Sequence, residues 1–194
     1  MTDTIDPRHS ALLVMDYQNG IIGSLPDAEN LLDRTAGAIS LMRERGGHIG
    51  YVRVAFTEQD YDRIPPSSIM AAMVDPERRA AMHAEAPGTA VHERVAPEPG
   101  DIQVRKTRIG AFSTTDLDEQ LRARDVHTLV LAGVATSGVV LSTVIEAVDR
   151  DYRVVLLTDA CGDADPELHT LLTERMLGKR SRLSSTEELP SLLG

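Results

Sequence analysis

Two oppositely charged side chains, Asp16 and Lys106, are the residues of this sequence best placed for chemistry. The aspartate follows the apolar run Ala11–Met15, and the lysine closely follows Ile102–Val104. A carboxylate beside buried surface has a raised pKa unless a cation lies near it, and a lysine can be that cation. Such a pair could exchange protons with a substrate, or it could be an ion pair that only supports the fold.

A turn of small residues, Gly133–Val140, follows the apolar run Thr128–Ala132. Backbone N–H groups at the start of a helix are unpaired and attract negative charge, so a developing oxyanion could be stabilised there. The same residues also fit an ordinary strand-to-helix turn in which Thr136 or Ser137 caps the helix. Taken alone, the segment leaves both interpretations open.

The single cysteine, Cys161, lies close to Asp159 and Asp163. A reactive thiolate needs an electropositive setting, so we expect Cys161 to be a packed structural thiol. None of the six histidines has the spacing of a metal ligand, and we expect them to be structural or solvated. The sequence has no phosphate-binding loop and no G-x-G-x-x-G motif, so a nucleotide cofactor is unsupported.

Short apolar runs alternate with amphipathic stretches along the chain. Several runs are nearly continuous in apolar residues, which is the pattern of parallel strands covered on both faces. The alternation predicts an α/β fold with a parallel sheet, in which ligands bind beyond the carboxyl ends of the strands. The predicted strands are Ala11–Met15, His48–Val54, Ile102–Val104, Thr128–Ala132 and Arg153–Leu157, and the predicted helices are Ala28–Arg45, Asp116–Arg124, Ser137–Arg150 and Pro166–Met176.

Length and charge narrow the class of protein. The chain has 194 residues, and we expect one domain over residues 1–194 because no room is left for a second core. Asp60–Gly100 is irregular and rich in proline, and we expect a long excursion with a helix in its middle or a substrate lid. A net charge of −10 disfavours nucleic acid and anionic membranes as partners. The polar N-terminus and the lack of a long apolar stretch predict a cytoplasmic protein.

Motifs in a fixed order connect the chain to a known family. The segments ALLVMDYQNGI, KTRIGAFSTTDLDEQL and TLVLAGVATSGVVLSTVIEAVDRDYRVVLLTDAC resemble the isochorismatase-like hydrolase superfamily, and the resemblance extends from about His9 to about Leu183. It implies a three-layer αβα sandwich with a central, mostly parallel sheet of about six strands.

The resemblance also implies roles for individual residues. Asp16 corresponds to the family's catalytic acid or base, and Lys106 to its catalytic lysine. The turn after the fourth predicted strand often holds a cis peptide in the family, here between Val134 and Ala135, and helps to form an oxyanion hole. The implied oxyanion turn is Val134, Ala135, Thr136, Ser137 and Gly138, and the implied substrate-binding positions are Gln18, Phe56, Arg108 and Phe112, the last resembling a packing residue below the site.

Val139 is the main departure from the family pattern. It occupies the position of the nucleophilic cysteine in the family's amidases, and a valine cannot attack a carbonyl. The hydroxyls of Thr136 and Ser137 would need a strong base aligned with them to replace the thiol. The zinc-binding Asp-x-His of nicotinamidases is also missing after His48–Val54, so we expect no metal and no other cofactor.

Two functions remain open for such a chain. Isochorismatases cleave a vinyl ether by protonating it, which needs an acid rather than a thiol, and Lys106-x-Arg108 resembles their motif. Thr136-Ser137 departs from the Ala-His of isochorismatases and resembles small unassigned hydrolases. We therefore expect a cofactor-independent hydrolase of a small-molecule substrate that uses Asp16 and Lys106. The alternative is a catalytically silent member whose cleft binds a small ligand or a partner.

Family members are often dimers or larger, so we expect a homo-oligomer.

Overall fold

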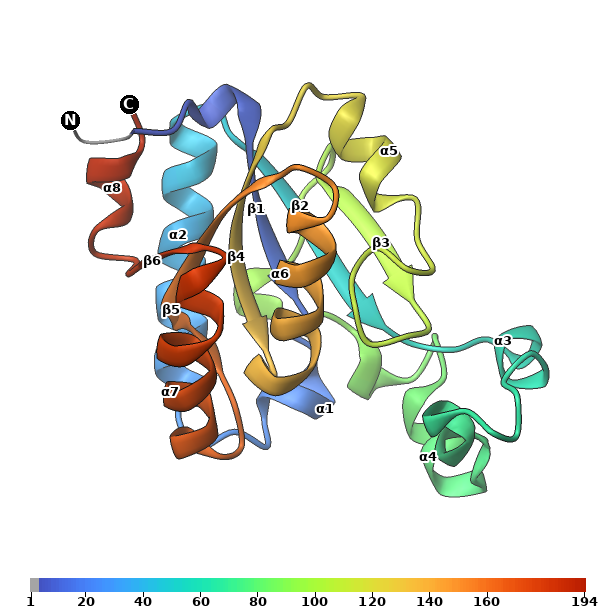
Figure 1. The fold of residues 1–194 in the computed structure, drawn as a ribbon. Coiled ribbons are helices and arrows are strands. Elements are labelled where there is room, and N and C mark those ends of the chain that lie inside the picture. The colour runs from blue at the N-terminus through green and yellow to red at the C-terminus, as the bar shows by residue number, and fades with distance from the viewer. Residues whose placement is uncertain (1–3) are drawn as a thin grey trace.

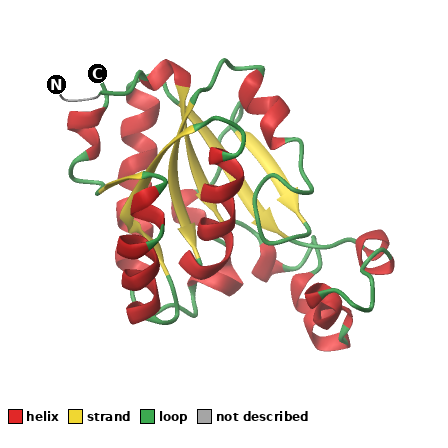
Figure 2. Ribbon diagram, viewed as in Figure 1, coloured by secondary structure: helices red, strands yellow, loops and turns green. Residues whose placement is uncertain are grey.

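The computed structural model describes residues 4–194, in which a six-stranded parallel sheet lies between layers of helices (Figures 1 and 2). The strand order is β3-β2-β1-β4-β5-β6, so the chain first builds the sheet outward from β1 and then crosses over to the other side. The predicted α/β class and three-layer architecture are confirmed. The strands are β1 Ser10–Met15, β2 His48–Val54, β3 Ile102–Lys106, β4 Thr128–Val134, β5 Arg153–Gly162 and β6 Arg182–Ser184.

Alternate residues of β1 point into the two different layers. Leu12 and Val14 pack with the long helix α2, whereas Leu13 and Met15 pack with α5 and α6. Both faces of the strand are therefore buried, which explains why its sequence is apolar without alternation. The helices are α1 Asn19–Ile22, α2 Ala28–Glu44, α3 Glu58–Asp62, α4 Pro76–Met82, α5 Leu117–Arg122, α6 Leu141–Val148, α7 Pro166–Arg175 and α8 Leu189–Leu192.

Several strands run further than the apolar pattern predicts. β3 continues to Lys106, β4 to Val134 and β5 to Gly162, because ladder pairing persists where the apolar run has ended. The predicted helix Ser137–Arg150 instead begins with a single π-helical turn, Thr136–Val140, before α6. The short edge strand β6 has no apolar run long enough to predict it.

The segment that follows β2 stands away from the sheet (Figure 1). It carries α3, α4 and short 3₁₀ turns, and Phe56, Tyr61 and Ile64 form a small apolar cluster at its base. Helix α4 confirms the helix expected in the middle of this excursion, while its use as a substrate lid stays a prediction. Within residues 4–194, no helix is long and apolar enough to cross a membrane.

Candidate active site

Asp16 and Lys106 meet at the carboxyl ends of the strands. Asp16 directly follows β1, and Lys106 is the last residue of β3, two strands away. The Lys106 ammonium lies 2.9 Å from Asp16 Oδ2. Asp16 is 5% exposed and Lys106 is 2% exposed, so water screens this ion pair poorly. The sheet topology thus brings together two residues that lie far apart in the sequence.

The backbone turns sharply at Asp16, directly after β1. Its φ of 57° is left-handed, a conformation that aspartate and asparagine adopt more readily than most residues. The Gln18 N–H donates to the Asp16 carbonyl at 2.7 Å and closes a tight turn. An aspartate therefore suits this position both for its charge and for its backbone.

The Lys106 ammonium has an acceptor for each of its three protons. Besides Asp16 Oδ2, it donates to the carbonyls of Arg108 at 3.2 Å and Ile109 at 2.9 Å. No proton is left for a ligand while these bonds hold. The lysine thus anchors the carboxylate and the loop after β3 to each other.

Asp16 Oδ1 has no hydrogen-bond partner. It is the single buried side-chain oxygen or nitrogen in this condition among the residues that the structure describes. Burial raises the pKa of Asp16 from 3.8 to about 6, and the charge and hydrogen bond of Lys106 oppose the rise. A buried carboxyl with such a pKa exchanges a proton near neutral pH, and Oδ1 is the oxygen free to do so.

The turn after β4 lies beside Asp16, since Met15 pairs with Gly133 in the sheet. The peptide bond between Val134 and Ala135 is cis, as the resemblance implied. Within residues 4–194, no acceptor is bonded to the N–H groups of Ala135 and Thr136. The Ser137 N–H donates to Asp163 Oδ2 at 2.8 Å. Only part of the implied oxyanion turn therefore has free donors.

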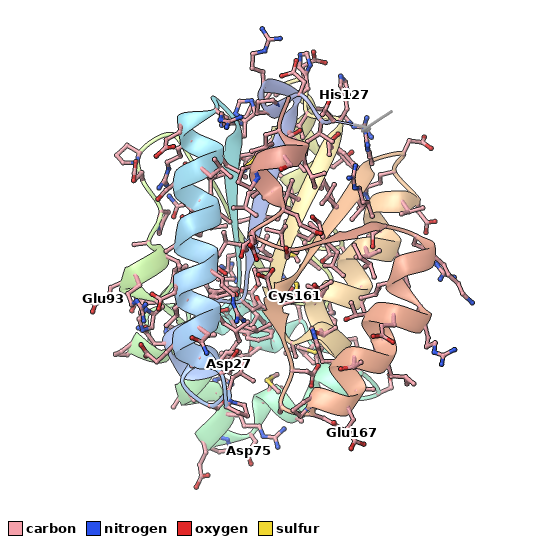
Figure 3. All side chains as sticks on the ribbon, turned by 90° about the vertical axis from the view of Figure 1, so that its left-hand side faces the viewer. Asp27, Asp75, Glu93, His127, Cys161 and Glu167 are labelled. Atoms are coloured by element: carbon pink, nitrogen blue, oxygen red, sulfur yellow. The ribbon has the colours of Figure 1, made fainter. Side chains whose placement is uncertain are left out.

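Neither Val139 nor Cys161 offers a nucleophile. Val139 is 2% exposed and packs in the apolar cluster that contains Leu131 and Phe112. Cys161 lies in the interior (Figure 3), and its thiol faces the Leu131 carbonyl at 3.8 Å. Burial raises the pKa of this thiol to about 12, which agrees with a structural role.

The implied substrate-binding residues are in different situations. Gln18 is fully buried and bonds to backbone groups of Val54 and Thr89. Phe56 is also fully buried and stacks on a tyrosine, while Phe112 stacks on Tyr152. These contacts are all structural, so substrate binding by these residues stays a prediction. Arg108 is half-buried, and among the described residues its guanidinium bonds only to Thr107.

A further contact, which the sequence does not predict, supports this turn from helix α7. The Thr136 hydroxyl lies 2.7 Å from His169 Nδ1 on α7, although 33 residues separate the two in the chain. No short motif signals such a pairing. The histidines His48 and His127 lie at the opposite end of the sheet, and Figure 3 shows His127 far from Asp27 and Glu167. The described residues contain no group of three or more His, Cys, Asp or Glu side chains that could hold a metal ion.

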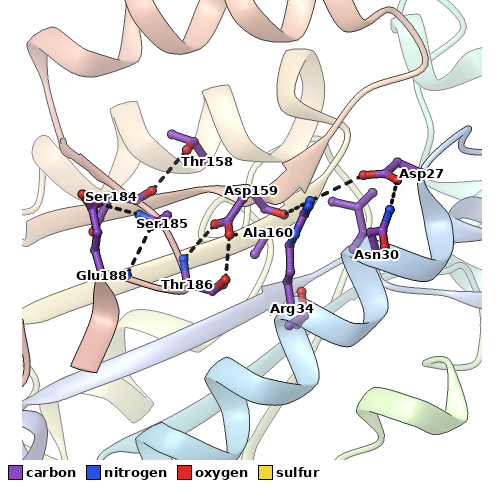
Figure 4. A network of polar contacts seen from close by, with 12 residues as sticks. Asp27, Asn30, Arg34, Thr158, Asp159, Ala160, Ser184, Ser185, Thr186 and Glu188 are labelled. Carbon is purple, nitrogen blue, oxygen red and sulfur yellow. Dashed lines mark hydrogen bonds and ion pairs between the residues drawn. The ribbon is translucent and has the colours of Figure 1, made fainter. Parts of the chain in front are cut away.

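A cavity of about 230 Å³ lies next to this contact, between α2 and α7. Its walls include Leu31, Cys161 and His169, and Arg34 forms part of its rim. Figure 4 shows Arg34 reaching toward Asp27 and Asp159, whose carboxylate in turn binds Thr186. The polar groups at this end of β5 are therefore largely bonded to one another.

Comparison with known proteins places the chain in a family. The isochorismatase domain model matches residues 10–188. The chain belongs to the isochorismatase family. It is 32% identical to a probable isochorismatase from Pseudomonas chlororaphis over 96% of this chain and 87% of the relative. It is 31% identical to a probable inactive nicotinamidase from Arabidopsis thaliana over 84% of this chain and 85% of that protein. An isochorismatase family structure from Burkholderia thailandensis superposes with a TM-score of 0.80 at 27% identity, covering 100% of this chain and 99% of that one.

Proposed function

We propose that this isochorismatase-family hydrolase cleaves a small vinyl ether of the isochorismate type by acid catalysis at Asp16, without a covalent intermediate. The unpartnered Oδ1 of Asp16 is the observation that carries the proposal. A thiol mechanism has no support, because Val139 stands at the nucleophile position and Cys161 is buried with a raised pKa. The similarity to a probable isochorismatase supports the same substrate class.

The reaction needs one proton delivered to carbon. Protonated Asp16 gives the proton on Oδ1 to the terminal carbon of the enol ether, and an oxocarbenium ion forms. The new carboxylate is stabilised because Lys106 already lies 2.9 Å from Oδ2. Water then adds to the cation and returns a proton to Asp16, and the hemiketal breaks into a ketone and an alcohol. From an isochorismate-type substrate the ketone is pyruvate.

Substrate binding in this proposal depends on cationic and N–H groups near Asp16. Lys106 has no proton to spare for the substrate, so its role is to hold Asp16 and to stabilise its ionised form. Arg108 still has free N–H groups among the described residues and is our candidate for binding a substrate carboxylate. The N–H groups of Ala135 and Thr136 are the candidates for binding a second oxygen of the substrate.

Pyruvate release tests the proposal directly. Purified protein is incubated with isochorismate, and pyruvate is followed with lactate dehydrogenase and NADH. We expect release well above the buffer rate, and release at the buffer rate by Asp16→Asn. Asparagine is preferred to alanine here because it tolerates the left-handed backbone at this position. Release by the unmodified protein at the buffer rate would contradict the vinyl-ether activity.

A second candidate function is a silent member that only binds a ligand. The strong burial of Asp16 and Lys106 favours it, since these side chains are 5% and 2% exposed, and one relative is named a probable inactive nicotinamidase. A thermal-shift screen of small acids and amides separates the two functions. A compound that raises the melting temperature but is never converted supports binding alone.

The proposal also covers the cellular location and the oligomeric state of the protein. We expect a cytoplasmic protein that acts on a small molecule as a dimer or larger homo-oligomer. Light scattering after size-exclusion chromatography measures the number of copies, and a mass of one chain would contradict the expected oligomer.

A further inference from the structure

A polar contact ties helix α7 to the turn that follows β4. Thr136 is fully buried, and its hydroxyl lies 3.1 Å from the Gly162 carbonyl and 2.7 Å from His169 Nδ1. A hydroxyl has only one proton, and a carbonyl can only accept. When Thr136 donates to Gly162, His169 must therefore carry its proton on Nδ1 and donate to Thr136.

The setting of His169 supports this arrangement. Burial lowers the pKa of His169, and the charge of Asp163 opposes the shift, so the imidazole stays neutral near pH 7. Nδ1 then carries the proton, and no hydrogen-bond partner of Nε2 is found in residues 4–194. A neutral ring of fixed tautomer is a directional donor to the turn.

A second bond from the same segment holds the next residue of the turn. Asp163 accepts the Ser137 N–H at 2.8 Å, and Asp165 caps the start of α7 through the N–H groups of Glu167 and Leu168. Within α7, Thr173 is the only buried residue. Helix α7 therefore has no fully buried apolar side chain of its own, and these polar contacts join it to the turn.

We propose that His169 is a positioning residue for the oxyanion turn, acting through Thr136. It does not touch the reacting atoms. By fixing the Thr136 side chain, it holds the peptide group between Ala135 and Thr136, which carries the unpartnered Thr136 N–H and directly follows the peptide group that carries the unpartnered Ala135 N–H. The inference rests on the proposed function for its effect on the rate, whereas the tether itself is independent of any activity.

The tether is tested by amide hydrogen exchange of a peptide that spans residues 133–141. His169→Leu removes the donor and should speed exchange there about three- to tenfold, the loss expected for one hydrogen bond. His169→Asn places an N–H close to the position of Nδ1 and should restore the original rate. Glu174→Gln, an exposed change on the same helix, is the control. Unchanged exchange in His169→Leu would overturn the tether.

Kinetics then separate positioning from helix packing. We expect kcat for pyruvate release to fall about 10- to 100-fold in His169→Leu, with KM changed less than about threefold, and to recover in His169→Asn. Thr136→Val should lose a similar factor, and the double variant should lose no more than either single variant. Failure of His169→Asn to recover kcat would overturn the positioning role. An unmodified protein that releases no pyruvate would contradict the proposed function, and the exchange result would still decide the tether.

Discussion

Asp16 and Cys161 are both buried titratable groups at the carboxyl end of the sheet, yet their surroundings differ in one decisive way. Asp16 lies 2.9 Å from a buried ammonium, and its pKa is raised only to about 6. Among the described residues, no cation is bonded to the Cys161 thiol, and burial raises its pKa to about 12. Burial alone therefore silences a titratable group, whereas burial with one fixed counter-charge keeps proton exchange near neutral pH.

The largest expected effect is on Asp16 itself. Asp16→Asn keeps the backbone preference but removes the transferable proton, so kcat/KM for pyruvate release should fall about 10²- to 10⁴-fold. Steady-state kinetics measures the loss, and circular dichroism checks the fold. Cys161→Ala is the matched buried control and should stay within about twofold of the unmodified protein. A similar loss in both variants would mean that disturbed packing, and not the loss of the transferable proton, lowers the rate.

Removing the Lys106 charge should leave the Asp16 carboxyl buried without a counter-charge. In Lys106→Met, Asp16 at pH 8 must either stay ionised without a counter-charge or take up a proton on folding, and the free energy of unfolding should fall by about 3–5 kcal/mol. The double variant with Asp16→Asn should regain most of this loss, since no buried charge remains. Urea unfolding at pH 8 measures both. The chain's other lysine offers the control, and Lys179→Met should change stability by less than about 0.5 kcal/mol.

The pH dependence of the rate should report the protonated form of Asp16. Its pKa is raised to about 6, so the acid is present below that pH and lost above it. We expect kcat/KM to fall about tenfold per pH unit above roughly pH 6. A rate that rises over the same range would point to a base or a nucleophile instead.

The smallest expected effect is the reactivity of Cys161. Its raised pKa and its 4% exposure should leave it nearly unmodified by iodoacetamide in the native protein at pH 8, and readily modified in urea. Mass spectrometry counts the added groups. Rapid native alkylation would show that burial without a cation does not silence this group.

The sheet and the acid–base pair could be predicted from the sequence because short local patterns indicate both. Each of the central strands is a short apolar run, and Asp16 and Lys106 lie where those runs stop. The ends of the strands were less predictable, because β5 continues through polar residues such as Thr158 and Asp159 before it pairs with β4 again at Cys161 and Gly162. The support of the turn by His169 was missed because it joins residues that only the folded chain brings together.

The residues that line a pocket could not be predicted from the sequence either. A family position identifies Gln18 and Phe112, but it does not say whether their side chains face a ligand or the backbone. In the fold, the Gln18 side chain donates hydrogen bonds to the carbonyls of Val54 and Thr89. The Phe112 ring lies under Arg150 and against Tyr152. Which way a side chain faces depends on tertiary packing.

The most direct test of acid catalysis at Asp16 is turnover in heavy water. Protonation of the enol ether carbon places one solvent deuterium on the methyl group of the released pyruvate, and early time points avoid later exchange. Proton NMR and mass spectrometry should find one deuterium per pyruvate, formed by the unmodified protein and not by Asp16→Asn above the buffer rate. Pyruvate released by the protein without deuterium, or at an unchanged rate by Asp16→Asn, would contradict the account.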